Sequence, residues 1–231
     1  MTGIRRCCVG LLLLVLTAVL VFADAPAPPP RLPPSATGKV DLRPVAVVSL
    51  GDSTLSGEGA GDYLPGTRGE NGNFCHRSAH AAVQRIVLPG VTRRINLACS
   101  GAGSANIGFN TPQNAAETSQ ATRLGELARQ YRIDAVVVAV GANDGPSFAA
   151  VVMRCAQAWV KRWAPPCSAD LSAQWPVRVA AMVPDVTAAM ADVRTAMRGA
   201  GYRDDDYELV LQSYPAPLTE RLAPELQDLS G

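Results

Sequence analysis

Residues 45–53 read VAVVSLGDS. The first six side chains are apolar or small, and they follow one another without polar alternation. A short continuous run of this kind is typical of a strand that is covered on both faces, as in a parallel sheet. Gly51 permits a sharp turn at the end of the run, and two polar residues, Asp52 and Ser53, follow it directly. The stretch therefore predicts a buried strand with polar side chains at its carboxyl end.

Three further segments, residues 94–99, 135–140 and 208–213, are predicted to form strands, and the second of them is again a continuous apolar run. Two of them also close on a glycine and small polar residues, SG at residues 100–101 and GAND at residues 141–144. In a parallel sheet the working face lies at the carboxyl ends of the strands. The three polar strand ends are therefore expected to converge on one crevice.

Helical spacing is found between the predicted strands, at residues 78–87, 118–131 and 171–199. The last segment is one long helix or two helices, with Pro176 and Pro184 as the expected interruptions. Strand, loop and helix in repetition predict an α/β fold, a doubly wound parallel sheet with right-handed crossovers, in a single domain.

The polar strand ends supply candidates for acyl transfer, which requires an exposed nucleophile and donors for a developing oxyanion. Ser53 is the candidate nucleophile. The backbone N–H groups of Ser53 and Gly101 and the side-chain amide of Asn143 are candidate oxyanion donors. A glycine suits the second position because a side chain there would keep the backbone away from a substrate.

These residues resemble a known family. The GDS of residues 51–53, the NLACSG of residues 96–101 and the GAND of residues 141–144 resemble, in order, three sequence blocks of the SGNH/GDSL hydrolases. The NFCHRS of residues 73–78 is similar to the disulfide-bearing branch typified by secreted actinobacterial lipases and esterases. The resemblance covers roughly residues 45–215.

The resemblance implies a flavodoxin-like three-layer α/β/α fold. It also implies that Ser53 is the nucleophile of a serine esterase or lipase, and that Ser53, Gly101 and Asn143 line the oxyanion hole. The expected partner is a small-molecule ester or lipid substrate, and neither a metal nor an organic cofactor is implied.

The chain departs from the family in its last block, an Asp-x-x-His that supplies the general base. It has no histidine after His80, and Asp228 is followed by Gly231 where the histidine should stand. We expect that the domain, residues 44–231, is incomplete at its C-terminus and that the chain alone is nearly inactive, because a serine without its base is a poor nucleophile. A naturally inactive relative is the competing interpretation. For His76 and His80 a solvated or capping role is favoured over that of a replacement base.

Two other functions share the same residues: a non-catalytic envelope protein that binds an acylated or glycosylated ligand, and an acyltransferase. The acceptor of an acyl group depends on the shape and hydration of the crevice, so the motifs do not separate a transferase from a hydrolase.

The N-terminus has the pattern of a secretory signal peptide over residues 1–25: two arginines, an apolar run at residues 9–22 and a small-x-small site at residues 23–25. The run is shorter than the roughly 20 residues that cross a bilayer as a helix. Pro26 hinders cleavage, so a retained membrane anchor is the alternative. Residues 26–43 are predicted to form a proline-rich linker. A secreted or cell-envelope protein is expected.

Four cysteines follow the leader, an even number in a chain predicted to be exported. They allow three pairings, and Cys75 with Cys99 and Cys155 with Cys167 are preferred because both close short loops; free buried thiols are the alternative. The net charge is +1 and the arginines form no basic stripe, which argues against a nucleic-acid partner. No C-x-x-C occurs and only two histidines are present, so zinc is not expected.

Overall fold

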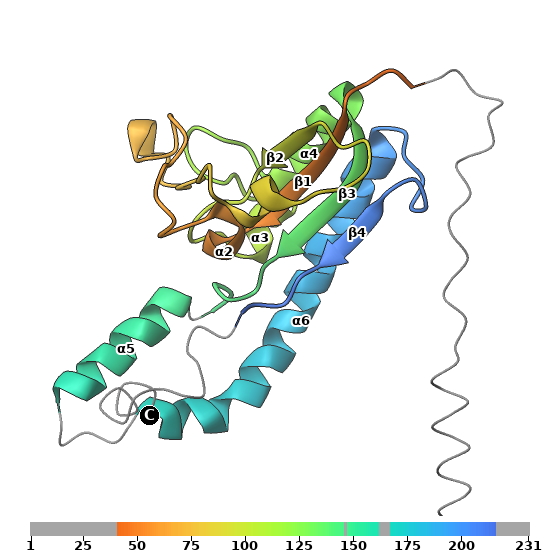
Figure 1. Cartoon of the computed structure of the whole chain (residues 1–231). Coiled ribbons are helices and arrows are strands. Elements are labelled where there is room, and N and C mark those ends of the chain that lie inside the picture. Colours follow the sequence, from red (N-terminus) through yellow and green to blue (C-terminus); the bar gives the residue numbers. More distant parts are fainter. Residues whose placement is uncertain (1–40, 146, 162–166, 216–231) are drawn as a thin grey trace, which may run out of the picture. The chain divides into compact units, whose positions relative to one another are not determined.

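The computed structural model describes residues 41–145, 147–161 and 167–215. The chain divides into two compact units, Met1–Asp41 and Leu42–Gly231, and the second contains all the described elements (Figure 1). The predicted signal peptide, residues 26–40 of the predicted linker and the segment from Asp228 to Gly231 lie outside the described residues. The boundaries proposed for them stay predictions.

A four-stranded parallel sheet forms the centre of the second unit, in the order β2-β1-β3-β4. The strands are β1 (Val45–Gly51), β2 (Arg93–Asn96), β3 (Arg132–Ala139) and β4 (Glu208–Leu211). They lie where the apolar runs predicted them, with β2 and β4 shorter at their carboxyl ends. The α/β class with an all-parallel sheet is confirmed.

The inner position of β1 follows from its composition, because the apolar side chains of residues 46–50 are completely buried between two layers. Its last residue must also be a glycine. Gly51 pairs with Ala139 of β3, and a Cβ atom on Gly51 would lie 2.1 Å from the Ala139 carbonyl oxygen. Only a residue without a side chain lets the two strands approach so closely at this end.

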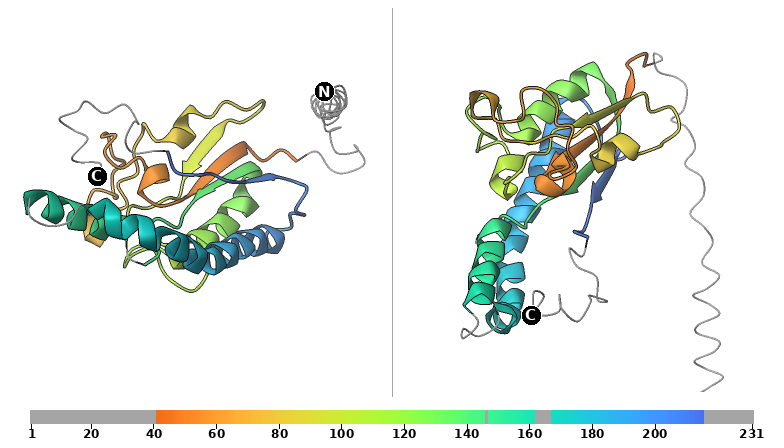
Figure 2. Two further views of the ribbon diagram at one scale, coloured as in Figure 1. Left: turned by 90° about the horizontal axis from the view of Figure 1, so that it is seen from below. Right: turned by 60° about the vertical axis from the view of Figure 1, so that its left-hand side comes forward.

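Helices and turns connect the strands (Figure 2). They are α2 (Ser53–Ser56), η1 (Glu70–Gly72), η2 (Ala82–Arg85), α3 (Ser104–Ile107), α4 (Gln120–Gln130), α5 (Phe148–Val160) and α6 (Cys167–Gly199). One face of the sheet is covered by α4 and the C-terminal half of α6, whose apolar side chains form the main core with β1 and β3. The other face is covered by the turn η2, where Ala81 and Val83 pack against Val47 and Ala135.

The order of the strands places a topological switch point at β1. The connection to β2 runs through η2 on one face, whereas the connections to β3 and β4 run through helices on the opposite face. In open parallel sheets ligands bind in the crevice outside the carboxyl ends of the strands where the order reverses. Here those are the ends of β1 and β3, which lead directly to residues 52–53 and 140–144.

Two expectations about helices need correction. Residues 78–87 contain only one 3₁₀ turn, η2, because Ser78 N donates to the last carbonyl of α2, Ala79 N donates to Asp62 O, and Val83 packs directly on the sheet. Neither Pro176 nor Pro184 interrupts α6, which runs unbroken. Both prolines are exposed, where water can satisfy the carbonyls that lose their helical donors. Helix α5 was not predicted.

The preferred cysteine pairing is present. Cys75 is bonded to Cys99, and Cys155 to Cys167. The first pair is buried beside the end of β2, and the second joins α5 to the start of α6. Such bonds are typical of extracytoplasmic proteins. Among the described helices, none combines the length and apolar character needed to cross a membrane.

Candidate active site

The carboxyl ends of β1, β2 and β3 are joined by hydrogen bonds around Gly51. Cys99 N donates to Gly51 O over 2.9 Å, and Asp52 N donates to Ala139 O over 3.2 Å. The buried side chain of Gln120, at the start of α4, makes two hydrogen bonds with the backbone of Gly51. Gly51 N donates to Gln120 Oε1 over 2.8 Å, and Gln120 Nε2 donates to Gly51 O over 2.9 Å. The chain therefore leaves β1 at a point held by both neighbouring strands and by α4.

Ser53 is the first residue of α2 and follows this junction directly. Asp52 caps the helix, because its Oδ1 accepts a hydrogen bond from Thr54 N over 2.9 Å. Asn96, the last residue of β2, holds the helix against the sheet, since its Nδ2 donates to two carbonyls of α2. Ser53 is half-buried. It is thus presented on a short turn that is anchored at both ends.

Gly101 lies in the turn after β2, and Asn143 lies in the loop after β3. The φ angle of Gly101 is +81°, in the left-handed region that favours glycine, and a Cβ atom there would meet no described atom within 4 Å. The Asn143 amide Nδ2 donates to Ala102 O over 3.1 Å. Because an amide nitrogen carries two hydrogens, one remains available for a second acceptor.

A second contact joins the same two loops. Ser104 N donates to Asp144 Oδ1 over 2.8 Å, and Ser104 Oγ donates to Asp144 Oδ2 over 2.5 Å. Ser53, at the start of α2, and Gly101 and Asn143, on the loops after β2 and β3, therefore lie on three segments that hydrogen bonds connect at one end of the sheet. The arrangement matches the expected convergence of the strand ends, and the chemical roles of the three residues stay predictions.

Both histidines lie beside carboxylates of the loop after α2. His76 Nδ1 is 2.7 Å from Glu58 Oε2, and His80 Nε2 is 3.8 Å from Asp62 Oδ2. The His76 ring also stacks on Tyr63, with 4.8 Å between ring centroids. Both imidazoles therefore contact side chains of residues 58–63, the loop that follows α2.

Glu58 connects this loop to the end of β2. Its Oε2 also accepts a hydrogen bond from Ser100 Oγ over 2.5 Å, and its backbone N–H donates to Ser53 O over 3.1 Å. Partial burial by itself would raise the pKa of the Glu58 carboxyl, but the hydrogen bonds from Ser100 and His76 lower it overall. Glu58 is therefore an anionic residue that links Ser53, the candidate nucleophile, to Ser100, the residue before Gly101.

Asp52 is the most deeply buried carboxylate of the site. Its Oδ2 accepts a hydrogen bond from the hydroxyl of Tyr214, which in turn accepts one from Ala142 N. Burial raises the pKa of Asp52, and the hydrogen bonds from Tyr214 and Thr54 offset only part of this effect. Burial and the bond to Asp52 together raise the pKa of the Tyr214 hydroxyl far above its ordinary value.

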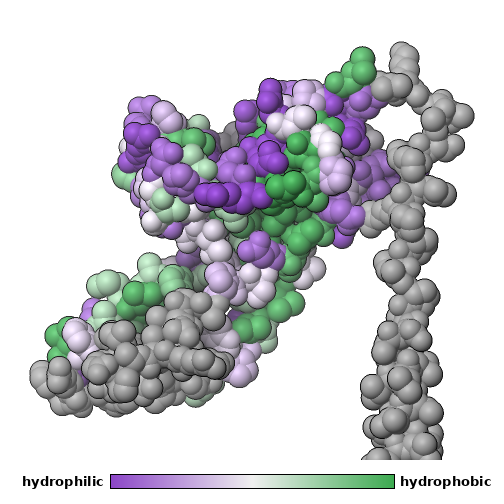
Figure 3. All heavy atoms as spheres, viewed as in Figure 1, coloured by the Kyte–Doolittle hydropathy of each residue, from purple (hydrophilic) through white to green (hydrophobic). Residues whose placement is uncertain are grey.

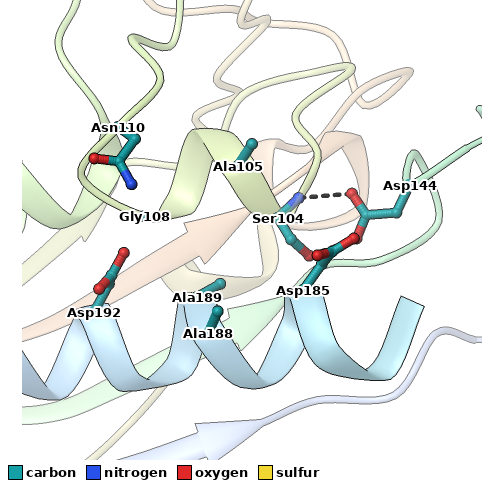
Figure 4. Close-up of a pocket in the computed structure, with 9 residues that line it drawn as sticks. All are labelled: Ser104, Ala105, Gly108, Asn110, Asp144, Asp185, Ala188, Ala189 and Asp192. Atoms are coloured by element: carbon teal, nitrogen blue, oxygen red, sulfur yellow. Dashed lines mark hydrogen bonds between the residues drawn. The ribbon is translucent and has the colours of Figure 1, made fainter. Parts of the chain in front are cut away.

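Beside Asp144 lies a pocket of about 270 Å³ between α3 and α6 (Figure 4). Asp144 and Asp185 point into it from different elements. Asp192, further along α6, accepts a hydrogen bond from Phe109 N. Within the described ranges no group of three histidine, cysteine or acidic side chains is arranged to hold a metal ion.

Several of these residues were missed in the sequence. Gln120 and Tyr214 carry no local signal, because their partners are 69 and 162 residues away. Glu58 lies between two glycines, close to Ser53. A charged side chain in a glycine-rich loop beside the candidate nucleophile was the only local sign that this residue belongs to the site. Ser100 lies inside a recognised block but was not assigned a role.

The comparison with family models adds to this geometry. The model of the GDSL-like lipase/acylhydrolase family matches residues 47–168, more than half of the chain, and the range includes Ser53, Gly101 and Asn143. Curated proteins gave no match in a separate comparison, and neither did solved structures. A parallel sheet with the family's sequence blocks at its strand ends agrees with this match. The chain belongs to the family of GDSL-like lipases and acylhydrolases, hydrolases of the esterase and lipase type.

Proposed function

We propose that this protein hydrolyses carboxylic esters of lipid or acylated substrates through an acyl-enzyme on Ser53. The Ser53 hydroxyl attacks the ester carbonyl. The N–H groups of Ser53 and Gly101 and the Nδ2 of Asn143 bind the oxyanion of the tetrahedral intermediate. The alcohol leaves, and water hydrolyses the acyl-enzyme. The supporting observation is the set of hydrogen bonds that joins the three loops carrying these residues at one end of the sheet.

The proton acceptor for Ser53 is the missing part of this mechanism. Of the two histidines, His76 binds Glu58 and His80 faces Asp62, and the printed sequence contains none after His80. We expect the chain by itself to react slowly, because loss of the histidine base costs a serine hydrolase several orders of magnitude in rate. An imidazole supplied in solution should replace that base in part.

Chemical rescue tests the proposal on the chain as it is. The protein is incubated with a fluorophosphonate probe, with and without added imidazole, and the adduct is located by mass spectrometry. We expect slow phosphonylation of Ser53 that imidazole accelerates, and none at this position in Ser53→Ala. Ser100→Ala, a hydroxyl at the same end of the sheet, is the matched control and should keep the adduct. Equal labelling of the Ser53→Ala variant, or no adduct on Ser53 with imidazole present, would overturn the assignment.

The contacts of His76 with Glu58 and of His80 with Asp62 favour a second candidate, a non-catalytic protein that binds acylated or glycosylated ligands in the same crevice. It predicts saturable binding of a fatty-acid ester without any serine adduct. An acyltransferase would form the same acyl-enzyme as a hydrolase. Product analysis with glycerol as acceptor separates the two, because only a transferase yields the new ester in preference to the free acid.

We propose an extracytoplasmic location, secreted or in the cell envelope. The two disulfide bonds and the signal-peptide pattern of residues 1–25 support it. If the leader is retained as an anchor, the N-terminal segment would tie the protein to the membrane. N-terminal sequencing of material exported by an expressing cell distinguishes a cleaved leader from a retained one.

A further inference from the structure

Gly101 lies at the third position of a four-residue turn, in which Ala102 N donates to Cys99 O over 3.0 Å. Its φ angle is +81°, whereas Ser100 at the second position is not in the left-handed region, and this combination is typical of a type II turn. The Gly101 N–H belongs to the middle peptide of the turn. Within the described part of the chain this N–H has no hydrogen-bond partner. The bond that closes the turn therefore does not fix where the Gly101 N–H lies, and other contacts must do so.

Two contacts hold Ser100, the residue before it. Ser100 N donates to Cys75 O over 3.2 Å, and Ser100 Oγ donates to Glu58 Oε2 over 2.5 Å. A hydrogen bond to an ionised carboxylate is stronger than one between neutral groups. The buried Ser56 Oγ lies 3.1 Å from Ser100 Oγ, but it also donates to Ser53 O, and its one hydrogen cannot serve both. The Glu58 carboxylate is therefore the contact that fixes the Ser100 side chain.

Glu58 is also bonded to the segment that carries the candidate nucleophile. Its N–H donates to Ser53 O over 3.1 Å, directly after the left-handed Gly57 that ends α2. Ser53 is the first residue of α2, and the N–H groups of a first helical turn have no acceptor within the helix. Glu58 therefore contacts both segments that present a candidate oxyanion donor, through its backbone to Ser53 and through its side chain to Ser100.

Two aromatic side chains orient the Glu58 carboxylate. His76 Nδ1 lies 2.7 Å from Glu58 Oε2, and the hydroxyl of Tyr63 donates to Glu58 Oε1 over 3.1 Å. The rings of His76 and Tyr63 stack on each other, and the Tyr63 hydroxyl accepts a bond from Gly59 N. Both carboxylate oxygens thus have defined partners, so the side chain is held in one orientation.

These bonds lie at a surface that water reaches. The Glu58 side chain is 40% exposed, and in Figure 3 the upper left of the molecule, where η1 and the loop after α2 lie, is mainly hydrophilic. Water can replace lost partners at such a surface, so hydrogen bonds and ion pairs there contribute little to stability. A set of bonds that adds little stability but joins Ser53 to the residue before Gly101 indicates a role in placing these two residues.

We propose that Glu58 is a positioning residue for the reaction of Ser53, because it holds the Gly101 N–H at the separation from the Ser53 N–H that a tetrahedral oxyanion requires. The inference rests on the proposed function, which assigns both N–H groups to the oxyanion hole. Glu58 acts through Ser100 and through the backbone of Ser53. Complete loss of one oxyanion donor costs about 10²–10³ in rate, and a displaced donor should cost less, about tenfold.

Glu58→Gln tests the proposal, because the amide has one oxygen for three donors and its NH₂ group opposes one of them. Phosphonylation of Ser53 in the full chain is followed over a range of fluorophosphonate concentrations with imidazole present. At saturating probe the rate constant should fall about tenfold, and the half-saturating concentration should stay the same, because oxyanion donors act on the transition state. Glu70→Gln is the matched control. Glu70 is an exposed carboxylate that accepts from Arg68 N, and this variant should react like the wild type.

Ser100→Ala removes the other end of the same bond. The adduct should still form on Ser53, but about tenfold more slowly, as in Glu58→Gln. Since the two side chains act through one bond, E58Q/S100A should be no slower than either single variant. Effects that multiply in the double variant would overturn the proposal. It would also be overturned if Glu58→Gln reacted at the wild-type rate, or if only its half-saturating concentration changed.

Nuclear magnetic resonance of the unreacted protein separates a failure of this inference from a failure of the proposed function. Labelling with ¹³C-carbonyl serine and ¹⁵N-glycine selects the glycines that follow a serine, Gly57, Gly101 and Gly231, and Gly101→Ala identifies the second signal. Glu58→Gln should shift or broaden the Gly101 signal, whereas Glu70→Gln should leave it in place. An unchanged signal in Glu58→Gln would overturn the inference. If the wild type forms no adduct on Ser53, the proposed function fails, and the Gly101 signal alone decides whether Glu58 holds the turn.

Discussion

The hydroxyl of Tyr214 donates a hydrogen bond to the carboxylate of Asp52, a residue 162 positions earlier in the chain. The same hydroxyl accepts a bond from Ala142 N. Asp52 follows β1, Ala142 follows β3 and Tyr214 follows β4. One phenol therefore joins three strand ends and holds the residue directly before the candidate nucleophile.

Replacing Tyr214 with Phe should destabilise the protein by roughly 1–3 kcal/mol, because an oxygen of the buried Asp52 loses its donor. Urea unfolding measures the effect. Tyr207→Phe is the control: among the described residues the buried Tyr207 hydroxyl has no hydrogen bond of normal geometry, only a weak contact with Arg194, so its removal should cost little. An equal loss of stability in both variants would contradict the role given to Tyr214.

The raised pKa of Asp52 predicts how stability depends on pH. The folded protein holds this proton more tightly than the unfolded chain, so the contribution of Asp52 to stability falls as pH rises from about 4 through the folded-state pKa. In Asp52→Asn this titration is absent, and asparagine still caps a helix well. The stability of the variant relative to the wild type should therefore improve between pH 4 and pH 7, by about 1.4 kcal/mol for each unit of the pKa rise.

Urea unfolding at both pH values checks this prediction. Other groups titrate equally in the two proteins, so their effects cancel in the difference. A difference that is the same at pH 4 and pH 7 would mean that Asp52 is not protonated more readily in the folded state.

The two glycines at the site should respond differently to alanine. In Gly51→Ala the new Cβ meets a backbone oxygen of β3 at 2.1 Å, so the strands must separate and we expect the variant not to fold. In Gly101→Ala the Cβ enters open space, and only the left-handed φ opposes it, at a cost of about 1–2 kcal/mol. Circular dichroism and thermal unfolding of the pair measure both effects. A stable Gly51→Ala protein would contradict the close contact of β1 with β3.

The buried Arg77 and the half-buried Glu117 form an ion pair, and Arg77 also donates to the carbonyls of Leu97 and Ala98. Burial by itself would raise the pKa of Glu117, but the hydrogen bonds and charge of Arg77 lower it overall. Glu117→Gln should cost roughly 2 kcal/mol at pH 7, since it replaces charge-assisted hydrogen bonds to the buried arginine with neutral ones.

The exposed Glu126, paired with Arg123, provides the control: Glu126→Gln should cost under about 0.5 kcal/mol. The stabilising contribution of ionised Glu117 is present above pH 4.5 and is lost as pH falls through its lowered pKa. The difference in the free energy of unfolding between the wild type and Glu117→Gln should therefore become smaller at acidic pH. Denaturant unfolding from pH 7 down to pH 3 follows this change.

The two disulfides should be reduced in a fixed order. Cys75 and Cys99 are buried, whereas Cys155 and Cys167 are half-exposed between α5 and α6. Under native conditions dithiothreitol should open the second bond first, without loss of the sheet. Loss of the Cys75–Cys99 bond should then lower the free energy of unfolding by roughly 3 kcal/mol, from the entropy of its 24-residue loop. Alkylation followed by mass spectrometry gives the order.

The sequence by itself determined the strands, the polar residues at their carboxyl ends and the α/β class. These features are local: an uninterrupted apolar run and a terminal glycine have the same meaning wherever the strand lies in the sheet. The cysteine pairing was also foreseen, because short loops limit which cysteines can meet. Ser53, Gly101 and Asn143 could be proposed as site residues for the same reason, since each follows an apolar run directly.

The tertiary structure alone decided the rest. Packing of Val83 on the sheet replaced the helix expected at residues 78–87 with a single turn, and an exposed surface let α6 continue through two prolines. The hydrogen-bond partners of Asp52, Glu58 and Gly51 lie far away in the sequence. Such a bond depends on which two segments of the chain the fold brings together, and neither segment shows a periodic sequence pattern that would predict it. Local patterns specify secondary structure, and only the packed fold decides which polar groups meet.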